Sequence, residues 1–419
     1  MVILVSVYAC SPYDGSERAV GWNWICELDK YHQITALTSH IYKSEIEDYL
    51  IKHPLELSNT KFVYVEVPNT SWHKGYKLER LYYILWQKQA VKVAKELTQT
   101  QKFDLVHHIT YVTCILPTYM HKLGLPFLYG PVSGGENTPS IIGYPMSKKN
   151  RMMEIIRSAS QAFFRATPNF AKTMKKATLI VTTTDETKKI IPKKYFDKVR
   201  IFQSIGLNTE MFYPEPIKVG SKIKENKIPK FLMAGRMLYW KGYELGIAAF
   251  VKAIKSGCRA ELTILGDTEN NLVYEAHREN LKTLSGEHLN KEIRFVSKVE
   301  HSKMKAFYDG FDVLLNCSLR DSGCFVVMEG MSRALPIICV NTGGPKVNTT
   351  VESAIKIEPA PLKEMIDKTA EAIVELAENK EKREKMGAAA RKHALETFTL
   401  KARTAQMNKF YEEVMSLSK

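Results

Sequence analysis

Short apolar runs alternate with amphipathic stretches along most of the chain. The runs end in turn residues and have the length of buried parallel strands. Helical periodicity follows between them, for example over 79–97. The first series of strand-like runs is 2–9, 34–38, 62–67, 104–107, 126–129 and 178–183. This alternation predicts a parallel sheet with helices on both faces.

The pattern stops over 208–230, which is polar, rich in lysine and interrupted by Pro214, Pro216 and Gly220. We interpret this segment as an interdomain linker. A helix is predicted over 243–255, where apolar residues recur at helical spacing. A second series of strand-like runs follows the linker: 230–234, 261–265, 293–296, 312–316 and 336–340. The chain therefore predicts two Rossmann-like halves, each binding ligands beyond the carboxyl ends of its strands.

Length, charge and cysteine usage narrow the class of protein. A chain of 419 residues exceeds what one hydrophobic core supports. Its net charge of +15 points to an anionic partner: a nucleotide, a membrane surface or a nucleic acid. The seven cysteines are scattered, without a CxxC pair, as in a protein of a reducing compartment. The apolar N-terminus resembles a first strand, and no apolar run of 18 residues exists, so we expect a cytoplasmic protein.

Asp321 and Glu329 are the most informative pair of side chains. They stand eight residues apart, across a glycine-containing turn and the start of a predicted helix. A helix N-terminus attracts anions, and two carboxylates beside it suit a ligand that also carries hydroxyls. A nucleotide sugar has both features. The alternative is an acidic loop followed by a glutamate that complements the helix dipole.

Two cations follow another predicted strand. Gly235-Arg236 comes directly after the run 230–234, and Lys241-Gly242 opens the next helix. Arginine at a strand end and lysine at a helix start can hold one diphosphate between them. The alternative is a pair of solvated surface cations. The spacing excludes a Walker A loop, and no GxGxxG follows the first strand, which argues against dinucleotide oxidoreductases.

These motifs, taken together, resemble those of retaining glycosyltransferases of family 4, which have the GT-B architecture. The resemblance covers residues 5 to about 346, and the tail pattern extends it. It rests on Gly15-Ser-Glu-Arg-Ala-Val-Gly-Trp22, Val106-His107-His108-Ile-Thr110, Gly130-Pro-Val-Ser-Gly-Gly-Glu136, Gly235-Arg236 with Lys241-Gly242, Asp321 with Glu329, Leu335-Pro336 and Thr342-Gly343-Gly344.

The resemblance implies a role for each residue of the donor site. Arg236 and Lys241 would bind the diphosphate and stabilise the leaving nucleotide. Glu329 would bind ribose hydroxyls, and Asp321, where the family usually has Glu, would contact the transferred sugar. The remaining implied donor contacts are Gly15, which lets its loop approach the phosphates, the backbone amides of Gly323 and Cys324 near the sugar or phosphate, and Phe325.

The resemblance also implies an acceptor site in the N-terminal half. His107 would end a strand and line the acceptor site, and Gly134, Gly135 and Glu136 would shape the loop beside it. The implied catalytic residues are Asp321, His107, Arg236 and Lys241. The alternative for His107 is a polar residue at a strand end whose hydrogen bonds are all made within the fold. The alternative for the loop 134–136 is a glycine turn that binds no ligand.

The expected fold is α/β of GT-B type, with two Rossmann-like domains facing across a cleft. Residues 1–205, with a tail helix at about 398–419, would bind the acceptor, and 206–397 would bind a nucleoside-diphosphate sugar. The implied reaction is front-face transfer, with retention, to a glycan or polyprenyl-linked acceptor in cell-surface polysaccharide synthesis. No Asp-x-Asp motif occurs, so we expect neither a metal nor a cofactor.

A basic amphipathic helix is predicted within 148–165. It carries the cations Lys148, Lys149, Arg151, Arg157 and Arg165. Its apolar face consists of Met152, Ile155, Ile156, Ala159 and Phe163. One interpretation is an interfacial helix on anionic lipid, where a polyprenyl-linked acceptor would lie. The other is a helix packed on the N-terminal sheet with a solvated basic rim.

Two rival functions stay open at this point. Another GT-B enzyme, such as a nucleotide-sugar epimerase, would need no acceptor. A non-catalytic basic protein that binds membrane or nucleic acid belongs to a different class. No basic-aromatic motif accompanies the charge, so we expect no nucleic-acid partner.

Overall fold

The computed structural model describes residues 1–13, 15–68, 79–116, 118–213, 228–266 and 272–418. The chain forms two compact units. The first consists of Met1–Gly135, Ile155–Ile205 and Arg403–Lys419, and the second of Glu136–Glu154 and Gly206–Ala402. The predicted domains differ from these units at 136–154 and at 398–402, which the prediction places with the N-terminal half.

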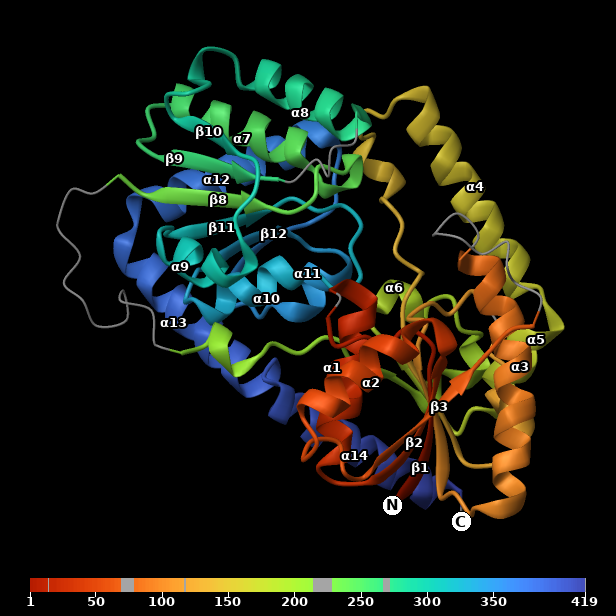
Figure 1. Ribbon diagram of the computed structural model, residues 1–419. Helices are drawn as coiled ribbons and strands as arrows, with labels where there is room; N and C mark the ends of the chain where they lie inside the picture. The colour runs from red at the N-terminus through yellow and green to blue at the C-terminus, as the bar shows by residue number, and fades with distance from the viewer. Residues whose placement is uncertain (14, 69–78, 117, 214–227, 267–271, 419) are drawn as a thin grey trace. The chain divides into compact units, whose positions relative to one another are not determined.

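The first unit contains a seven-stranded parallel sheet in the order β3-β2-β1-β4-β5-β6-β7. Figure 1 shows α1 and α2 on one side of this sheet and α3 on the other. Its strands are β1 (Val2–Val7), β2 (Gln33–Ser39), β3 (Thr60–Val65), β4 (Leu105–Thr110), β5 (Phe127–Val132), β6 (Leu179–Thr182) and β7 (Val199–Ile201). Its helices include α1 (Ser16–Asp29), α2 (Lys43–Lys52), α3 (Glu79–Thr100), α5 (Pro168–Lys176) and α6 (Asp185–Lys188).

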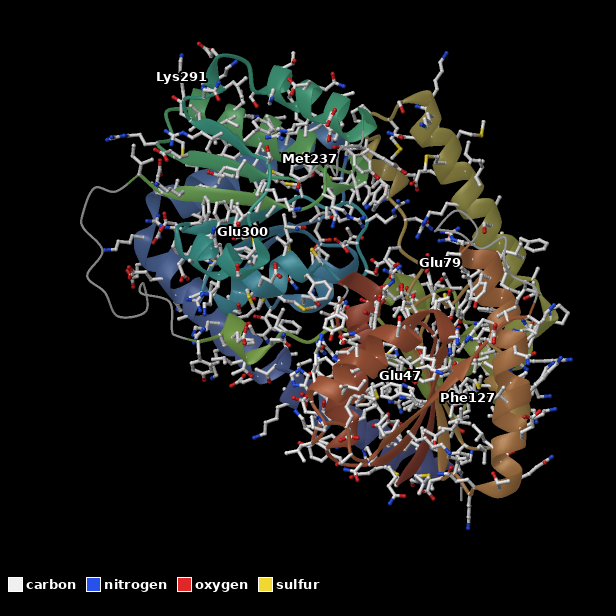
Figure 2. The ribbon with its side chains drawn as sticks, viewed as in Figure 1. Glu47, Glu79, Phe127, Met237, Lys291 and Glu300 are labelled. Carbon is white, nitrogen blue, oxygen red and sulfur yellow. The ribbon has the colours of Figure 1, made fainter. Side chains whose placement is uncertain are left out.

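Two long helices pass from one unit into the other along the chain: α4 (Lys148–Arg165) and α14 (Leu400–Leu417). The first was predicted from its periodicity, and the second was implied by the resemblance. Within the first unit, two side chains of α14 accept hydrogen bonds that fix the helix. Arg200 donates to Glu413, and Asn408 contacts the ring of His32 at 2.8 Å. The core of this unit contains Trp86 and Phe127, which is labelled in Figure 2.

The second unit contains a six-stranded parallel sheet in the order β10-β9-β8-β11-β12-β13. Figure 1 shows α7 and α8 on one face and α10 and α11 on the other. Its strands are β8 (Lys230–Ala234), β9 (Glu261–Leu265), β10 (Ile293–Val296), β11 (Val313–Asn316), β12 (Ile337–Val340) and β13 (Ala354–Ile357). Its helices are α7 (Tyr243–Lys255), α8 (Leu272–Ser285), α9 (Met304–Asp309), α10 (Phe325–Ser332), α11 (Gly343–Asn348), α12 (Leu362–Glu378) and α13 (Lys380–Thr397).

Both sheets share the strand order of doubly wound Rossmann folds. The order reverses between β1 and β4 in the first unit, and between β8 and β11 in the second. Loops that leave the carboxyl ends of such a strand pair diverge to opposite faces and leave room for a ligand. The fold therefore predicts a binding site beyond β8 and β11.

Residues 136–154 belong to the second unit for physical reasons. Ile142 and Tyr144 are buried in its hydrophobic core, and the Tyr144 hydroxyl donates to the Glu244 carboxylate. This packing explains the difference from the predicted boundary. Most of the predicted linker, 208–230, lies outside the described residues.

Candidate functional site

Three loops of the second unit start at the carboxyl ends of neighbouring strands. They follow β8, β11 and β12, which lie side by side in the sheet. The first loop carries Arg236 and Lys241, the second carries Asp321, and the third is Thr342-Gly343-Gly344. Because the strands are parallel, these loops meet at one edge of the sheet.

Glycine geometry holds the first loop against the end of β11. Gly242 has φ +68°, and a Cβ atom there would lie 1.9 Å from the carbonyl oxygen of Cys317. The Tyr243 hydroxyl donates to the carbonyl of Gly235 at 2.8 Å. Lys241, which precedes Gly242, is thereby placed beside the second loop. The side chain of Met237, which is labelled in Figure 2, fills the space beside Gly266.

Asp321 connects all three loops. The Lys241 ammonium forms an ion pair with one carboxylate oxygen, and the Cys324 N–H donates to the other at 3.1 Å. The backbone carbonyl of Asp321 accepts from the Gly344 N–H at 2.6 Å. A Cβ atom at Gly343 would lie 2.3 Å from that same carbonyl oxygen. The third loop thus needs its glycines to hold the second.

The ion pair is largely enclosed, since the side chains of Lys241 and Asp321 are 20% and 14% exposed. Burial lowers the pKa of Lys241, but the Asp321 carboxylate outweighs it, and the pKa lies above its usual value. Lys241 therefore stays protonated. The exposed Arg236 is near enough for its charge to act on Lys241, so the site brings two cations together.

The N-terminus of α10 lies directly after Asp321. Cys324 precedes the helix with φ +54°, and the amides of Phe325 and Val326 have no hydrogen-bond partner among the described residues. Gly323 is buried, and its carbonyl accepts from Asn348 at 2.7 Å. The two open amides, next to Lys241, form a site for an anion.

Cys324 requires a correction. Its backbone amide, predicted to face the ligand, is already used by the Asp321 carboxylate. Burial raises the pKa of its thiol well above the usual value, and the sulfur accepts from Asn316 at 3.4 Å. The amides that remain for a ligand belong to the next two residues of the chain.

Glu329 lies in the second turn of α10, and the first turn has no acidic residue. The alternative of a glutamate that complements the helix dipole is therefore not supported. The hydroxyl of Tyr308, a buried residue of α9, donates to Glu329 at 2.7 Å. Burial, and next the Glu329 charge, raise the pKa of Tyr308, so this hydroxyl remains a donor. The contact fixes the direction of the carboxylate.

A second polar cluster, which the sequence did not reveal, supports both loops. Glu154 accepts hydrogen bonds from Tyr239 and Arg320, and the Arg320 guanidinium lies 4.3 Å from the Trp240 ring. Trp240 directly precedes Lys241, and Arg320 directly precedes Asp321. Nothing in the local pattern around Glu154 signals a partner more than 80 residues away in the chain.

In the first unit, Gly15 stands at the start of α1 and is exposed. A Cβ atom there would meet nothing within 4 Å. At Gly21, by contrast, it would lie 2.0 Å from the Ala9 carbonyl oxygen. The fold itself thus requires glycine at position 21 but not at 15. This fits a loop that leaves room for a ligand, while the predicted donor contact of Gly15 stays a prediction.

Glu17 is a further candidate in the first unit, in the first turn of α1. Its carboxylate accepts from the Val112 N–H, beyond the end of β4, so it lies where the strand order reverses. Burial raises the pKa of Glu17 to about 7, with a smaller contribution from Glu79. The motif Gly-Ser-Glu of the sequence contains Glu17 and could have indicated it as a candidate, but no role was predicted for this residue from the sequence.

His107 needs a second correction, since β4 continues to Thr110 and the histidine is fully buried mid-strand. Burial lowers the pKa of His107 to about 3, so the ring is neutral. Nε2–H donates to the Gly130 carbonyl at 2.6 Å, because a carbonyl can only accept. Nδ1 accepts from the Tyr411 hydroxyl of α14 at 2.7 Å. The imidazole connects the tail helix to the sheet and has no nitrogen left for an acceptor.

The loop after β5 has structural constraints of its own. Gly134 has φ +112°, and its carbonyl accepts from Gln161 at 2.6 Å. A Cβ atom at Gly135 would lie 2.4 Å from the Cα atom of Thr187, whose hydroxyl also accepts from the Gly135 N–H. Glu136 is buried, with 4% exposure. Packing alone explains the glycines, and the acceptor role of this loop stays a prediction.

The described residues hold neither a metal cluster nor a membrane span. Among them, no group of three or more His, Cys, Asp or Glu side chains could hold a metal ion. No helix in the same residues is long and apolar enough to cross a membrane.

Sequence comparison gives two matches. Residues 216–393 match the family model described as Glycosyl transferases group 1. A curated protein of Methanocaldococcus jannaschii, described as an uncharacterized glycosyltransferase, is 28% identical over 219 residues. The match covers 50% of this chain and 52% of that protein, so the chain spans about half the length of the curated relative it matches.

Solved structures match over nearly the whole chain. A glycosyltransferase from Rickettsia africae has a TM-score of 0.64 at 16% identity and covers 99% of this chain and 98% of its own. Sucrose-phosphate synthase from Thermosynechococcus elongatus has a TM-score of 0.62 at 15% identity, and the match covers 99% of both chains. Anabaena HepE, in complex with UDP and glucose, has a TM-score of 0.57 at 13% identity, and the match covers 98% of this chain and 99% of HepE. These matches confirm the predicted fold class, α/β of GT-B type.

Proposed function

We propose that this chain is a retaining glycosyltransferase that moves a hexose-like sugar from a nucleoside diphosphate to a hydroxyl of an acceptor. The observation that carries the proposal is the convergence of Arg236, Lys241, Asp321 and the α10 N-terminus beyond β8 and β11. A site with two cations, open amides and carboxylates fits a ligand that carries both a diphosphate and hydroxyls. The match of 216–393 to a glycosyltransferase family supports it.

In this proposal the cations and the helix bind the phosphates. Lys241 and Arg236 neutralise the charge that develops on the leaving nucleotide, and the amides of Phe325 and Val326 add to this field. Two fixed cations can stabilise the charge on the leaving nucleotide, and we therefore propose transfer without a metal ion. Fixed charges need little reorganisation during the reaction, which is why a pre-formed cluster stabilises a transition state well.

The carboxylates bind hydroxyls. Glu329, oriented by Tyr308, accepts from the ribose, as the resemblance implies. Asp321 fixes Lys241 in the free protein and turns toward the transferred sugar when the diphosphate binds Lys241. Aspartate at this position reaches one methylene less far than glutamate. The length of residue 321 therefore bears on which sugar is accepted.

Transfer with retention is proposed as a front-face reaction, in which the leaving phosphate removes the proton of the attacking acceptor hydroxyl. No side chain of the described site is positioned as a covalent nucleophile. The acceptor is proposed to be a glycan or lipid-linked hydroxyl bound by the first unit, in cell-surface polysaccharide synthesis. His107 is left out of the acceptor site because both of its ring nitrogens are used within the fold.

The nucleotide of the donor is open to direct measurement. Anabaena HepE has been solved with UDP and with UDP-glucose, which makes UDP-sugars the first donors to test. A thermal-shift panel of UDP-, GDP- and ADP-sugars would identify the donor, because a ligand at a hundred times its Kd stabilises the native state by about 2.7 kcal/mol.

The proposal is tested by replacing Glu329. We expect Glu329→Ala to reduce transfer of radiolabelled sugar by about 100-fold or more, because a charged hydrogen bond to the donor is lost. Glu381→Ala, in the first turn of α13, is the matched control and should retain wild-type turnover. Both variants should unfold as cooperatively as the wild type in calorimetry.

Two results would contradict the proposal. Wild-type turnover by the Glu329 variant would remove the donor-site assignment. Release of free epimerised or hydrolysed sugar at the same rate with and without added acceptors would assign the site to an epimerase-like enzyme.

A further inference from the structure

Helix α4 is oriented opposite to a normal amphipathic surface helix, because its polar side faces the protein. Gln161 is only 6% exposed and donates to the Gly134 carbonyl. One and two turns earlier, Arg157 is partly buried and Glu154 accepts from Tyr239 and Arg320. These residues follow one another at helical spacing and form the contact stripe of α4. Besides Phe164, which packs against the core of the first unit, α4 is held in place by these hydrogen bonds.

The apolar side of α4 is left exposed. Ile155, Ile156 and Phe163 are 57%, 60% and 67% exposed, and Met152 and Met153 are at least half exposed. The alternative interpretation, in which the apolar side packs on the N-terminal sheet, is therefore wrong for these five side chains. A surface helix normally buries its apolar stripe in the core. A row of large exposed apolar side chains indicates an interaction surface.

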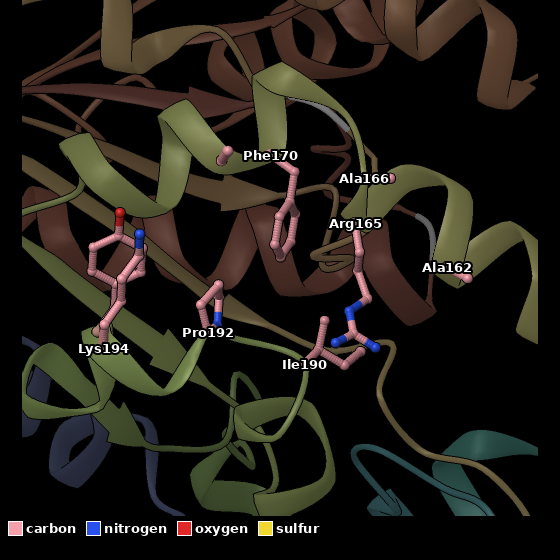
Figure 3. Close-up of a pocket in the computed structure, with 9 residues that line it drawn as sticks. Ala162, Arg165, Ala166, Phe170, Ile190, Pro192 and Lys194 are labelled. Carbon is pink, nitrogen blue, oxygen red and sulfur yellow. The ribbon is translucent and has the colours of Figure 1, made fainter.

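A hollow continues this surface at the C-terminal end of α4. It measures about 410 Å³ and is lined by Ala162 and Ala166 of the helix end, Phe170 of α5, and Ile190 and Pro192. Figure 3 shows two cations on its rim, Arg165 on one side and Lys194 on the other. The floor is apolar and the rim is positive, as a site for an anionic amphiphile requires.

The charge around α4 selects the partner. Residues 148–200 contain 14 lysines and arginines against four acids. Within the described residues, Lys148, Lys149, Arg151 and Arg165 form no ion pair. A second copy of the chain would bring like charges together, which opposes self-association. An anionic surface with an apolar interior matches both the exposed side chains and the cations.

We propose that α4 and the adjoining hollow dock the protein on a membrane of anionic phospholipid. The apolar side of α4 would lie at the boundary of headgroups and acyl chains, with Phe163 and Ile156 inserted. The cations at the helix start would contact lipid phosphates, and Arg165 and Lys194 would hold a headgroup at the hollow. The inference concerns binding alone and does not depend on the transferase activity.

The test measures flotation with vesicles of phosphatidylcholine, with and without about one-third phosphatidylglycerol. We expect binding to the anionic vesicles only. Ile156→Gln with Phe163→Gln should weaken it by about 100-fold, since two inserted side chains are lost. Lys148→Gln, Lys149→Gln and Arg151→Gln together should weaken it by a similar factor. Because all five residues are exposed, folding should be unaffected, as circular dichroism would check.

Matched controls exist in the first unit. Ile51→Gln with Leu55→Gln removes two side chains that are 79% and 93% exposed, outside α4. Lys88→Gln, Lys92→Gln and Lys95→Gln remove three exposed charges from α3. Both control proteins should bind like the wild type.

Three outcomes would overturn the proposal. The first is that the wild type does not bind anionic vesicles, and the second is that the α4 variants bind as the wild type does. The third is a lipid-free dimer in sedimentation that the Ile156 and Phe163 substitutions abolish, because the surface would then belong to a second copy.

Discussion

Lys241→Met and Asp321→Asn should shift the affinity for UDP in opposite directions. In the free protein Asp321 compensates the charge of Lys241, so a diphosphate must compete with this carboxylate for the ammonium. Removing the lysine removes a phosphate contact. Removing the carboxylate charge leaves the cation unpaired next to Arg236 and the open amides of α10. Two substitutions in one ion pair would thus have effects of opposite sign.

The geometry sets the magnitudes. A hydrogen bond from the ammonium to a phosphate contributes about 1.5–3 kcal/mol, so Lys241→Met should raise the Kd for UDP by about 10- to 100-fold. Releasing Lys241 from Asp321 should change the affinity less, because the desolvation cost of this largely enclosed pair offsets much of its attraction. We expect about 1 kcal/mol, a Kd about fivefold lower for Asp321→Asn. Transfer itself should nevertheless fall, because the contact to the sugar is lost.

Isothermal titration of UDP measures both effects, and a second ion pair of the same unit is the control. Lys252 and Asp367 form a pair at 2.6 Å on the surface, with side chains 52% and 38% exposed. Lys252→Met and Asp367→Asn should leave the Kd for UDP unchanged. Equal weakening by both substitutions at the site would refute the competition between Asp321 and the diphosphate, and unchanged affinity for both would remove the diphosphate from this site.

Two further substitutions test the first unit. Since the raised pKa of Glu17 favours its neutral form, stability should fall by up to about 3 kcal/mol as the pH rises from about 4.5 to 7. Glu17→Gln should remove that part of the pH dependence in calorimetry, and the exposed Glu96→Gln should not. Identical profiles for Glu17→Gln and the wild type would contradict a raised pKa of Glu17. Tyr411→Phe leaves Nδ1 of His107 without a donor and should cost about 1–3 kcal/mol in urea unfolding, with UDP affinity unchanged. Unchanged stability together with lost transfer would restore a catalytic role for His107.

Most strands could be predicted because buried parallel strands leave a continuous apolar run. The runs 230–234, 261–265 and 293–296 coincide with β8, β9 and β10. β7 and β13, with three and four residues at sheet edges, were missed, whereas β10, an edge strand of four residues, was predicted because three of its residues are large and apolar. Periodicity records which side chains are buried, and short edge strands bury few of them.

The donor loops could be predicted because their residues follow strand ends directly. Arg236 and Asp321 each come within a few residues of a strand, so parallel topology brings them to one edge without further information. The partners that orient them could not be predicted. Tyr308, Glu154 and the carbonyl-to-glycine contacts of the third loop depend on distances between segments far apart in the chain. His107 was misplaced for a related reason: the run 104–107 gave no sign that β4 continues to Thr110.

The orientation of α4 shows what periodicity leaves undetermined. An amphipathic pattern states that a helix has two sides, but it does not state which side meets the protein. Hydrogen-bonding demand decides this here. The Gly134 carbonyl needs a donor in the first unit, the Arg320 guanidinium needs an acceptor in the second, and a buried polar group without a partner costs about 1–3 kcal/mol. Gln161 and Glu154 meet these demands only if the polar side turns inward. The exposed isoleucines and Phe163 are then a necessary consequence of that orientation, and they make α4 the surface on which a partner has to be sought.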